Sequence, residues 1–391
     1  MRYRRYAIRL LIIAALACCA SFAYFAYGKY RIASLERACD TARQAKQWPQ
    51  LESLSAQWIE WEQDKALPWL YAAEAASEQG QPARSAAYLY YLPNNDPRTP
   101  AALLELTHLQ FGVLNQPIAA AKTCERILRI QPDFAEAHRR LVLFYAMSRQ
   151  RLRLIEETRR AIQVGCDTPE TYLYLFGADW ITFTNGYDLN LQWLQSAPDN
   201  ETFLVAAAFH LAQVGTLGDA SDELLPDGAP KAAQLMNELL VRYPKNLEVL
   251  AFHLDFFIVR EDEERVTELL SQAPPEAVQD SRFWRYKGWV HEARREFDEA
   301  EEAYLKGSEL NPFDHQVCHR LASVYRHFGE LQLVEKYQIM ATLGKEVMRD
   351  SLQSPDSQSL AGELLAKMAQ YADQCGDTLV SNRLRERLDS K

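Results

Sequence analysis

Residues 281–314 read SRFWRYKGWVHEARREFDEAEEAYLKGSELNPFD, and this stretch decides the fold class of the chain. Like most of the sequence beyond Tyr30, it has the pattern of amphipathic helices of about 12–15 residues joined by short turns. Gly288 and Ala300 are small where two antiparallel helices must approach closely. Pro312 lacks an amide N–H and clashes with the preceding turn, so it ends the second helix. The stretch therefore predicts one pair of packed helices.

The same pattern recurs along the chain with a period of 34 residues. Units begin at Ser281 and His315, and less regular units begin at Ala66, Ala101 and Ala135. Self-similarity at a fixed period of this length is typical of stacked helical repeats. Residues at matching positions are Leu321, Ala322, Tyr325, Gly329, Leu331 and Ala341 in the unit at His315, and Trp69, Ala73, Gly80 and Pro97 in the unit at Ala66. They are Phe111, Ala120 and Pro132 in the unit at Ala101, and Leu141, Tyr145 and Ala161 in the unit at Ala135.

The best unit resembles the tetratricopeptide repeat family. Its large, small, aromatic, small, aromatic and proline positions are Trp284, Gly288, Phe297, Ala300, Tyr304 and Pro312. The resemblance covers most of the chain and implies a helix–turn–helix in each unit. We therefore expect an all-α protein, an α-solenoid of roughly nine or ten helix pairs with one N-terminal transmembrane helix.

The chain divides by sequence into four parts. We expect a basic flank at 1–6, a transmembrane signal anchor at 7–27, a repeat array at 32–347 and a capping helix pair at 348–391. Within the array, 169–280 matches the repeat pattern poorly, and 215–230 reads as an acidic insertion. Long loops in compact arrays are either functional or disordered.

The N-terminal segment Ala7–Tyr27 reads AIRLLIIAALACCASFAYFAY and is long enough to cross a bilayer. We interpret it as an uncleaved anchor, with Tyr30 and the preceding tyrosines at the membrane interface. Two alternatives stay open: a cleaved signal peptide with a site at Ala15–Ala17, and a lipoprotein signal that ends at Cys18 or Cys19. We expect a single-pass membrane protein with an extracytoplasmic body, although the positive charges on the two flanks nearly balance.

Charge and motifs exclude several classes of function. Residues 1–31 carry a formal charge of +6, so the rest of this −10 chain is strongly acidic and is a poor ligand for nucleic acid. The seven cysteines form no CxxC pair, and no nucleotide, hydrolase or zinc-protease motif is present. We expect no cofactor, no metal and no enzymatic activity. His315, Cys318, His319 and His327 have a spacing that would suit zinc, but we read them as ordinary residues of one repeat helix.

Repeat proteins of this family use the first helix of each unit to line a concave surface that holds peptides. The residues that the register places there are Arg139, Arg140, Arg282, Arg285, Tyr286, Trp289, His319, Arg320 and Arg326. Arginine pairs bidentately with carboxylates, so we hypothesise that this surface binds an acidic or C-terminal peptide segment. The alternative is that these arginines pair with glutamates of neighbouring helices.

The sequence therefore predicts a membrane-anchored scaffold that binds other proteins, in envelope assembly, secretion or quality control. One alternative is a lipoprotein or accessory subunit of an exported-polysaccharide machine. Another is an enzyme-associated domain with a pocket in the degenerate centre, around Trp180, Tyr187 and Trp193.

Overall fold

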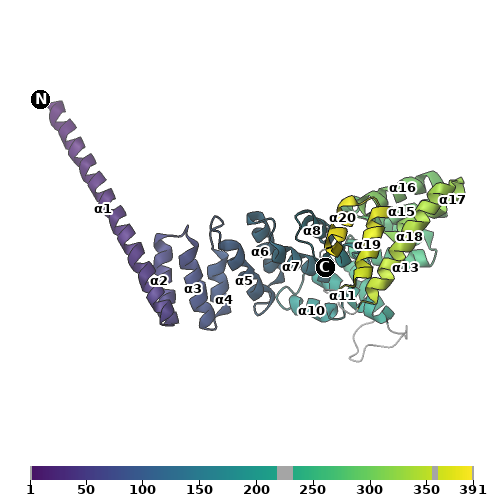
Figure 1. Cartoon of the computed structure of the whole chain (residues 1–391), viewed down its shortest axis with the longest axis horizontal. Coiled ribbons are helices and arrows are strands. Elements are labelled where there is room, and N and C mark those ends of the chain that lie inside the picture. The colour runs from purple at the N-terminus through teal and green to yellow at the C-terminus, as the bar shows by residue number, and fades with distance from the viewer. Residues whose placement is uncertain (1, 218–231, 355–359, 390–391) are drawn as a thin grey trace. The chain divides into compact units, whose positions relative to one another are not determined.

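The computed structural model describes residues 2–217, 232–354 and 360–389. Within these ranges the regular elements are twenty α-helices and one short 3₁₀ helix (Figure 1). The prediction of an all-α chain built from helical hairpins is confirmed. By its contacts the chain forms two compact units, residues 1–132 and 133–391. Most of the predicted insertion at 215–230, from residue 218 onward, lies outside the described residues.

The first unit contains the six helices α1 to α6. Their bounds are α1 (Arg2–Gln44), α2 (Trp48–Trp61), α3 (Ala66–Glu78), α4 (Pro82–Tyr90), α5 (Thr99–Phe111) and α6 (Pro117–Ile130). Since α1 is continuous, the apolar segment runs directly into the first repeat helix. By length and composition α1 is a candidate membrane span, and a signal sequence near an N-terminus meets the same criterion.

The second half of α1 packs on α2 as a repeat helix does. Leu35 and Cys39 are buried in one cluster with Trp58. Further toward the N-terminus, a side chain at Gly28 would meet the ring of Trp61 at 3.4 Å. The ring centroid of Tyr24 lies 6.0 Å from that of Trp61. The indole of Trp61, the last residue of α2, thus contacts α1 where the apolar segment of α1 ends.

The second unit contains the helices α7 to α20. Their bounds are α7 (Ala135–Met147), α8 (Arg151–Gln163), α9 (Pro169–Phe176), α10 (Gly186–Leu194), α11 (Glu201–Leu217), α12 (Ala232–Arg242), α13 (Leu247–Val259), α14 (Glu263–Ser271), the 3₁₀ helix η1 (Pro275–Gln279), α15 (Ser281–Ala293), α16 (Phe297–Leu310), α17 (His315–Phe328), α18 (Leu331–Leu352), α19 (Gly362–Gln374) and α20 (Thr378–Asp389). Four repeat units start where the sequence predicts, because Ala66, Ala135, Ser281 and His315 are each the first residue of a helix.

The turns inside the hairpins keep the repeat period in the backbone. Residues with positive φ recur 34 or 35 positions apart, first at Lys46, Gly80, Asn115 and Arg149, and later at Glu261, Arg295 and Gly329. A left-handed residue lets the chain reverse after a helix, and glycine adopts this conformation most easily. Since only two of these seven residues are glycine, the sequence shows the period less clearly than the backbone does. Between Arg149 and Glu261 the spacing is not a multiple of 34, in the stretch where the sequence pattern is also poor.

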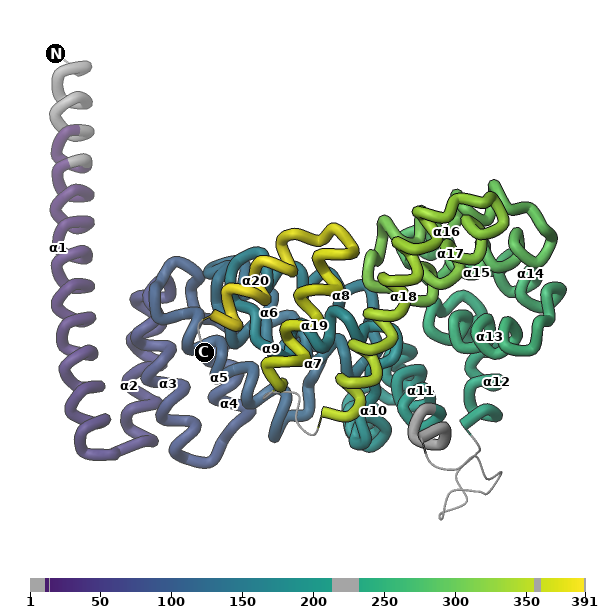
Figure 2. Tube along the Cα trace, turned by 45° about the vertical axis from the view of Figure 1, so that its right-hand side comes forward, coloured from purple at the N-terminus to yellow at the C-terminus, as the bar shows by residue number. Residues whose placement is uncertain are grey.

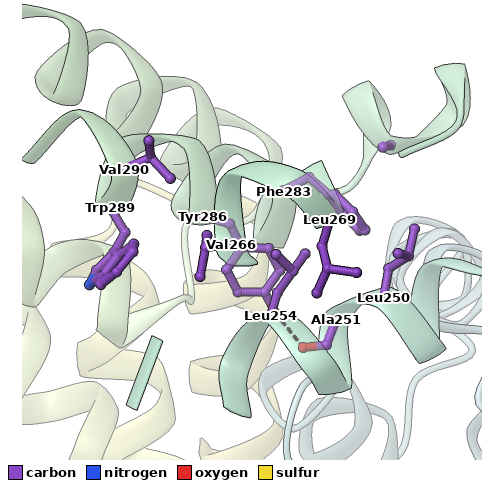
Figure 3. Packing of buried hydrophobic residues seen from close by; sticks show 10 residues of the cluster. Leu250, Ala251, Leu254, Val266, Leu269, Phe283, Tyr286, Trp289 and Val290 are labelled. Carbon is purple, nitrogen blue, oxygen red and sulfur yellow. Dashed lines mark hydrogen bonds between the residues drawn. The ribbon is translucent and has the colours of Figure 1, made fainter. Parts of the chain in front are cut away.

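The core of the second unit includes a cluster shared by α13, α14 and α15 (Figure 3). Leu250 and Leu254 of α13 and Val266 of α14 are fully buried there. Tyr286 of α15 is also fully buried, and its hydroxyl donates to the carbonyl of Ala251 at 3.4 Å. Burying one such apolar side chain stabilises a fold by about 1.5–3 kcal/mol. The cluster therefore fixes α15 against α13.

We expect Gly288→Ala to lower the free energy of unfolding by about 1–3 kcal/mol, because overpacking a tight core costs this much. A methyl group at Gly288 of α15 would lie 2.5 Å from Cε1 of Tyr304 on α16. The Tyr304 ring is fully buried, and its hydroxyl donates to Glu292 at 2.8 Å, so it has little room to move. Denaturant unfolding measures the effect. Gly362→Ala is the control, since among the described residues no atom outside its chain neighbours and its own helix backbone lies within 4 Å of the position that its added methyl group would take. Equal stability of the two variants would contradict the prediction.

The second unit also closes on itself, since its early helices contact its last ones. Arg159 of α8 donates to Asp377, just before α20, at 2.7 Å. Arg387 of α20 donates to Asp167, just before α9, at 2.8 Å. Figures 1 and 2 show α20 beside α8. A linear stack of repeats has contacts only between neighbours, so this unit departs from that arrangement.

Candidate binding site

Charged side chains from five parts of the second unit form one cluster, called here the ion network. Its members are Arg149, Arg151, Asp179, Glu248, Asp255, Asp280, Arg282, Arg285 and Asp314. They come from the start of α8, the segment between α9 and α10, α13, the start of α15 and the N-cap of α17. Four arginines face five carboxylates, so the network has one more negative charge than positive.

The N-terminal side of the network joins α8 to residues more than a hundred positions away. The Arg151 guanidinium pairs with Asp179 and donates from Nη1 to Asp280 at 3.1 Å and from Nη2 to Ser281 at 2.8 Å. Arg149 donates from Nη2 to Glu248 at 3.3 Å. Both arginine side chains are almost completely buried. Buried charges persist in folded proteins only when they are paired in this way.

Arg282 is the centre of the network. Its Nη2 lies 2.5 Å from Glu248 Oε1 and 2.7 Å from Asp280 Oδ2. Burial alone would raise the pKa of Asp280, but the charges of Arg151 and Arg282 outweigh it and hold this pKa below its usual range. Asp280 also caps α15, because it accepts from the backbone N–H of Arg282. One carboxylate thus starts the helix and joins it to α8.

Arg285 forms its own set of ion pairs beside α17 and a recess, and this set interacts electrostatically with Asp179 and Arg282 of the network. Its Nη1 donates to Asp314 at 2.9 Å and its Nη2 to Asp255 at 3.3 Å. The Asp314 side chain is buried, whereas that of Asp255 keeps 54% of its accessible surface. Asp255 lines the recess, whose walls limit its hydration and raise the pKa of this carboxyl above its usual value. Asp255 is therefore the most accessible carboxylate of the network.

The recess has a volume of about 400 Å³, within the range of ligand pockets. The aromatic members of its lining are Phe176, Trp180, Phe209, Phe252, Phe256 and Phe313. Its charged members are Asp179, Asp255, Arg260, Arg282, Arg285 and Asp314. Such a mixture of aromatic rings and fixed charges suits a ligand that combines an apolar part with a charged group.

A second hollow, called here the groove, lies between α17 and α18 and measures about 620 Å³. Its lining consists of His315, Gln316, His319, Arg320, Gln338, Ala341, Thr342 and Lys345, and it contains no carboxylate. Arg320 is held loosely, with Nη1 3.4 Å from Glu292. Burial lowers the pKa of His315 below its usual value. The groove shares His315 and Gln316 with the recess, so the two hollows are adjacent.

The structure places the predicted site residues in three different settings. Arg282, Arg285, Tyr286 and Trp289 are buried, because α13 packs across this face of α15 and the ion network occupies the guanidinium groups. His319 and Arg320 line the groove, and Arg326 is exposed on the same helix. Arg139 and Arg140 of α7 both pair with Glu136, and they line neither hollow.

Sequence reasoning missed the residues that complete both hollows. Lys345 lies in the long helix α18, beyond the repeat positions expected to face a ligand. Asp255 and Phe256 lie on α13, in the stretch where the repeat register is weak. Of the three aromatic residues considered for a central pocket, Trp180 lines the recess, whereas Trp193 is buried against Phe203. The charge of Asp255 within the largely apolar helix α13 was the available signal.

The spacing of His315, Cys318, His319 and His327 does not produce a metal site in the described part of the chain. No group of three or more His, Cys, Asp or Glu side chains is placed there to hold a metal ion. Cys318 is buried, and burial raises the pKa of its thiol to about 12. His327 stacks on Phe297 with ring centroids 3.7 Å apart. Cys318 and His327 therefore contribute to packing, whereas His315 and His319 line the groove.

The fold and the two hollows define a class, namely an α-helical repeat protein of the tetratricopeptide type with ligand-accessible hollows. No family model matches the sequence, and no curated protein matches it. Among solved structures, the chain is similar to a tetratricopeptide repeat protein from Parabacteroides merdae, with 11% identity, 75% of this chain and 99% of that chain covered, and a TM-score of 0.29.

Two further solved structures have comparable values. A MamA protein has 14% identity, with 50% of this chain and 98% of that chain covered and a TM-score of 0.30. The human IFIT1 dimer with PPP-AAAA has 13% identity, with 90% and 88% covered and a TM-score of 0.35. At these values the comparisons transfer neither a ligand nor an activity to this chain, whose repeat fold rests on its own helical hairpins.

Proposed function

We propose that this chain is a membrane-anchored scaffold that holds an acidic segment of a partner protein in its groove. The observation that carries the proposal is the charge of the groove, which presents Arg320 and Lys345 and has no carboxylate in its lining. The whole chain has a formal charge of −10, so a basic hollow is a local exception. Oppositely charged surfaces steer partners together and select among them.

The uncharged residues of the groove support the same ligand. Gln316, Gln338 and Thr342 are exposed and lie beside the two cations. Their amide and hydroxyl groups donate hydrogen bonds to carboxylates and to the backbone of an extended peptide. Among the described residues, Lys345 forms no ion pair, so a ligand carboxylate need not displace an internal partner. With α1 as its anchor, such a scaffold would act at a membrane, in envelope assembly, secretion or protein quality control.

Site-specific photo-crosslinking in native membranes tests the proposal. A photoreactive amino acid replaces Thr342, which is exposed in the groove, and captured peptides are sequenced by mass spectrometry. We expect one reproducible acidic segment to be captured. Arg320→Glu combined with Lys345→Glu should reduce its capture about tenfold or more, because like charges would then face each other.

The control is Lys306→Glu combined with Lys336→Glu, which changes the net charge equally at two exposed positions outside both hollows. This variant should capture the segment as the unmodified protein does. Equal capture by both charge-reversed variants, or a captured segment without acidic residues, would refute the proposed groove.

A further inference from the structure

The recess beside the groove has a different chemistry from the groove itself. Three of its aromatic side chains are accessible to solvent, since Trp180 and Phe252 are half-buried and Phe256 is exposed. Phe256 keeps 41% of its surface, and Val259 at the end of α13 keeps 81%. Exposed rings around a hollow favour the burial of an apolar group.

Two of the charged side chains that line the recess are exposed, namely the carboxylate of Asp255 and the guanidinium of Arg260 at its edge. Arg282 and Arg285 line the recess, but each already pairs with two carboxylates. The network has one surplus carboxylate, and Asp255 is its most accessible member. Its single ion pair, to Arg285 at 3.3 Å, is among the longest contacts of the network. The recess therefore offers the Asp255 carboxylate to a ligand, and Arg282 and Arg285 are already paired with carboxylates.

The aromatic rings of this region already hold cations of the chain itself. The Arg260 guanidinium lies 3.5 Å from the ring centroid of Phe256, and that of Arg149 lies 3.9 Å from the centroid of Phe209. Arg260 is exposed at the edge of the recess and donates to the Phe256 carbonyl at 3.2 Å. In the described part of the chain it has no carboxylate partner. A guanidinium over a ring is attracted by the negative face of the π-system.

We propose that the recess binds a basic side chain, a lysine or an arginine, of the same partner segment whose acidic part lies in the groove. This inference rests on the proposed function, since His315 and Gln316 line both hollows and let one extended segment reach them. The aliphatic part of the side chain packs against Phe252 and Phe256, and its cationic end pairs with Asp255. The partner segment is thus recognised by one basic residue next to several acidic ones.

Defined peptides test this pattern on the full-length protein in lipid nanodiscs. Two fluorescent peptides carry the same acidic stretch and differ in one flanking residue, which is lysine in one and the neutral norleucine in the other. We expect the lysine peptide to bind about tenfold more tightly. Asp255→Asn should remove this preference, whereas Asp298→Asn, at an exposed position outside both hollows, should keep it. Equal binding of both peptides to the unmodified protein would overturn the inference.

A second measurement separates the recess from the groove. Ligand-observed NMR compares n-butylguanidinium with its neutral analogue n-butylurea, and neither compound needs the groove. Saturation transfer to butylguanidinium alone, reduced several-fold in Asp255→Asn, supports the recess even when the acidic peptides fail to bind, which would contradict only the groove. Equal transfer to both compounds, or an unchanged signal in Asp255→Asn, refutes the cationic site.

Discussion

Replacing Arg282 with methionine is expected to lower the free energy of unfolding by about 3–5 kcal/mol, because removal of one partner leaves buried charge uncompensated. Arg282 pairs with Glu248 and with Asp280, and the Asp280 side chain is completely buried. Arg151 and Arg149 would remain as single partners of these two carboxylates. The network would then hold two surplus negative charges in place of one. Denaturant unfolding of the full-length protein measures the loss.

Two further variants separate charge from packing. Arg265→Met removes an exposed ion pair to Glu268, and it should leave the free energy of unfolding nearly unchanged. Asp280→Asn added to Arg282→Met removes one of the uncompensated charges, so it should recover part of the stability. A loss below about 1 kcal/mol for Arg282→Met would show that the ion network does not stabilise the second unit.

Acid is expected to destabilise the second unit through His210 of α11. This side chain is fully buried, and its Nε2 lies 2.9 Å from the Met147 carbonyl, so Nε2 carries the proton and donates it. Within the described part of the chain, its Nδ1 has no hydrogen-bond partner. Burial lowers the pKa of His210 from 6.5 to about 4, with a smaller contribution from the charge of Arg149. The folded protein therefore holds a neutral imidazole.

Stability changes with pH because His210 is protonated at a higher pH in the unfolded chain than in the folded protein. Between pH 6.5 and 4 the unfolded chain takes up a proton that the folded chain does not, so stability falls as the pH falls through this window. At about 1.4 kcal/mol for each pH unit, the loss reaches about 3 kcal/mol near pH 4. Burial also lowers the pKa of His253, which adds a change of the same sign.

His210→Gln keeps an amide donor for the Met147 carbonyl and removes the titrating group. Unfolding midpoints between pH 7.5 and 4.5 should therefore fall less steeply for this variant than for the unmodified protein. Phe209→Leu is the control, since it weakens the neighbouring packing to the same extent at every pH. Parallel pH profiles for the unmodified protein and His210→Gln would show that another group causes the acid lability.

The repeat pattern predicted the hairpins but not their closure into a compact unit. Ser281 and His315 start helices as expected, because the large and small residues of these repeats report local helix packing. The contacts of Arg151 with Asp280 and of Arg159 with Asp377 join residues far apart in sequence and have no period. The sequence pattern of an amphipathic helix does not show whether a charged residue faces solvent or pairs with a distant residue.

Only part of the candidate site was predictable, because the sequence does not show which charged residues meet a distant partner. Arg320 and His319 line the groove because the register places them on an accessible face of α17. The register placed Arg282 and Arg285 on the corresponding face of α15, but α13 packs across that face, and α13 and the N-caps of α15 and α17 supply the opposite charges. Tertiary contacts thus decided which arginines stay available.

The closure of the second unit has a consequence for how this protein changes in evolution. Linear repeat arrays gain and lose whole repeats by duplication and deletion of gene segments, because each hairpin needs only its neighbours. Deleting one 34-residue hairpin between α9 and α20 would separate Asp377 from Arg159 and Asp167 from Arg387. We therefore expect the number of hairpins in this unit to be fixed. We expect duplications and deletions to be tolerated instead in the first unit, where the principal contacts join helices that are close in sequence.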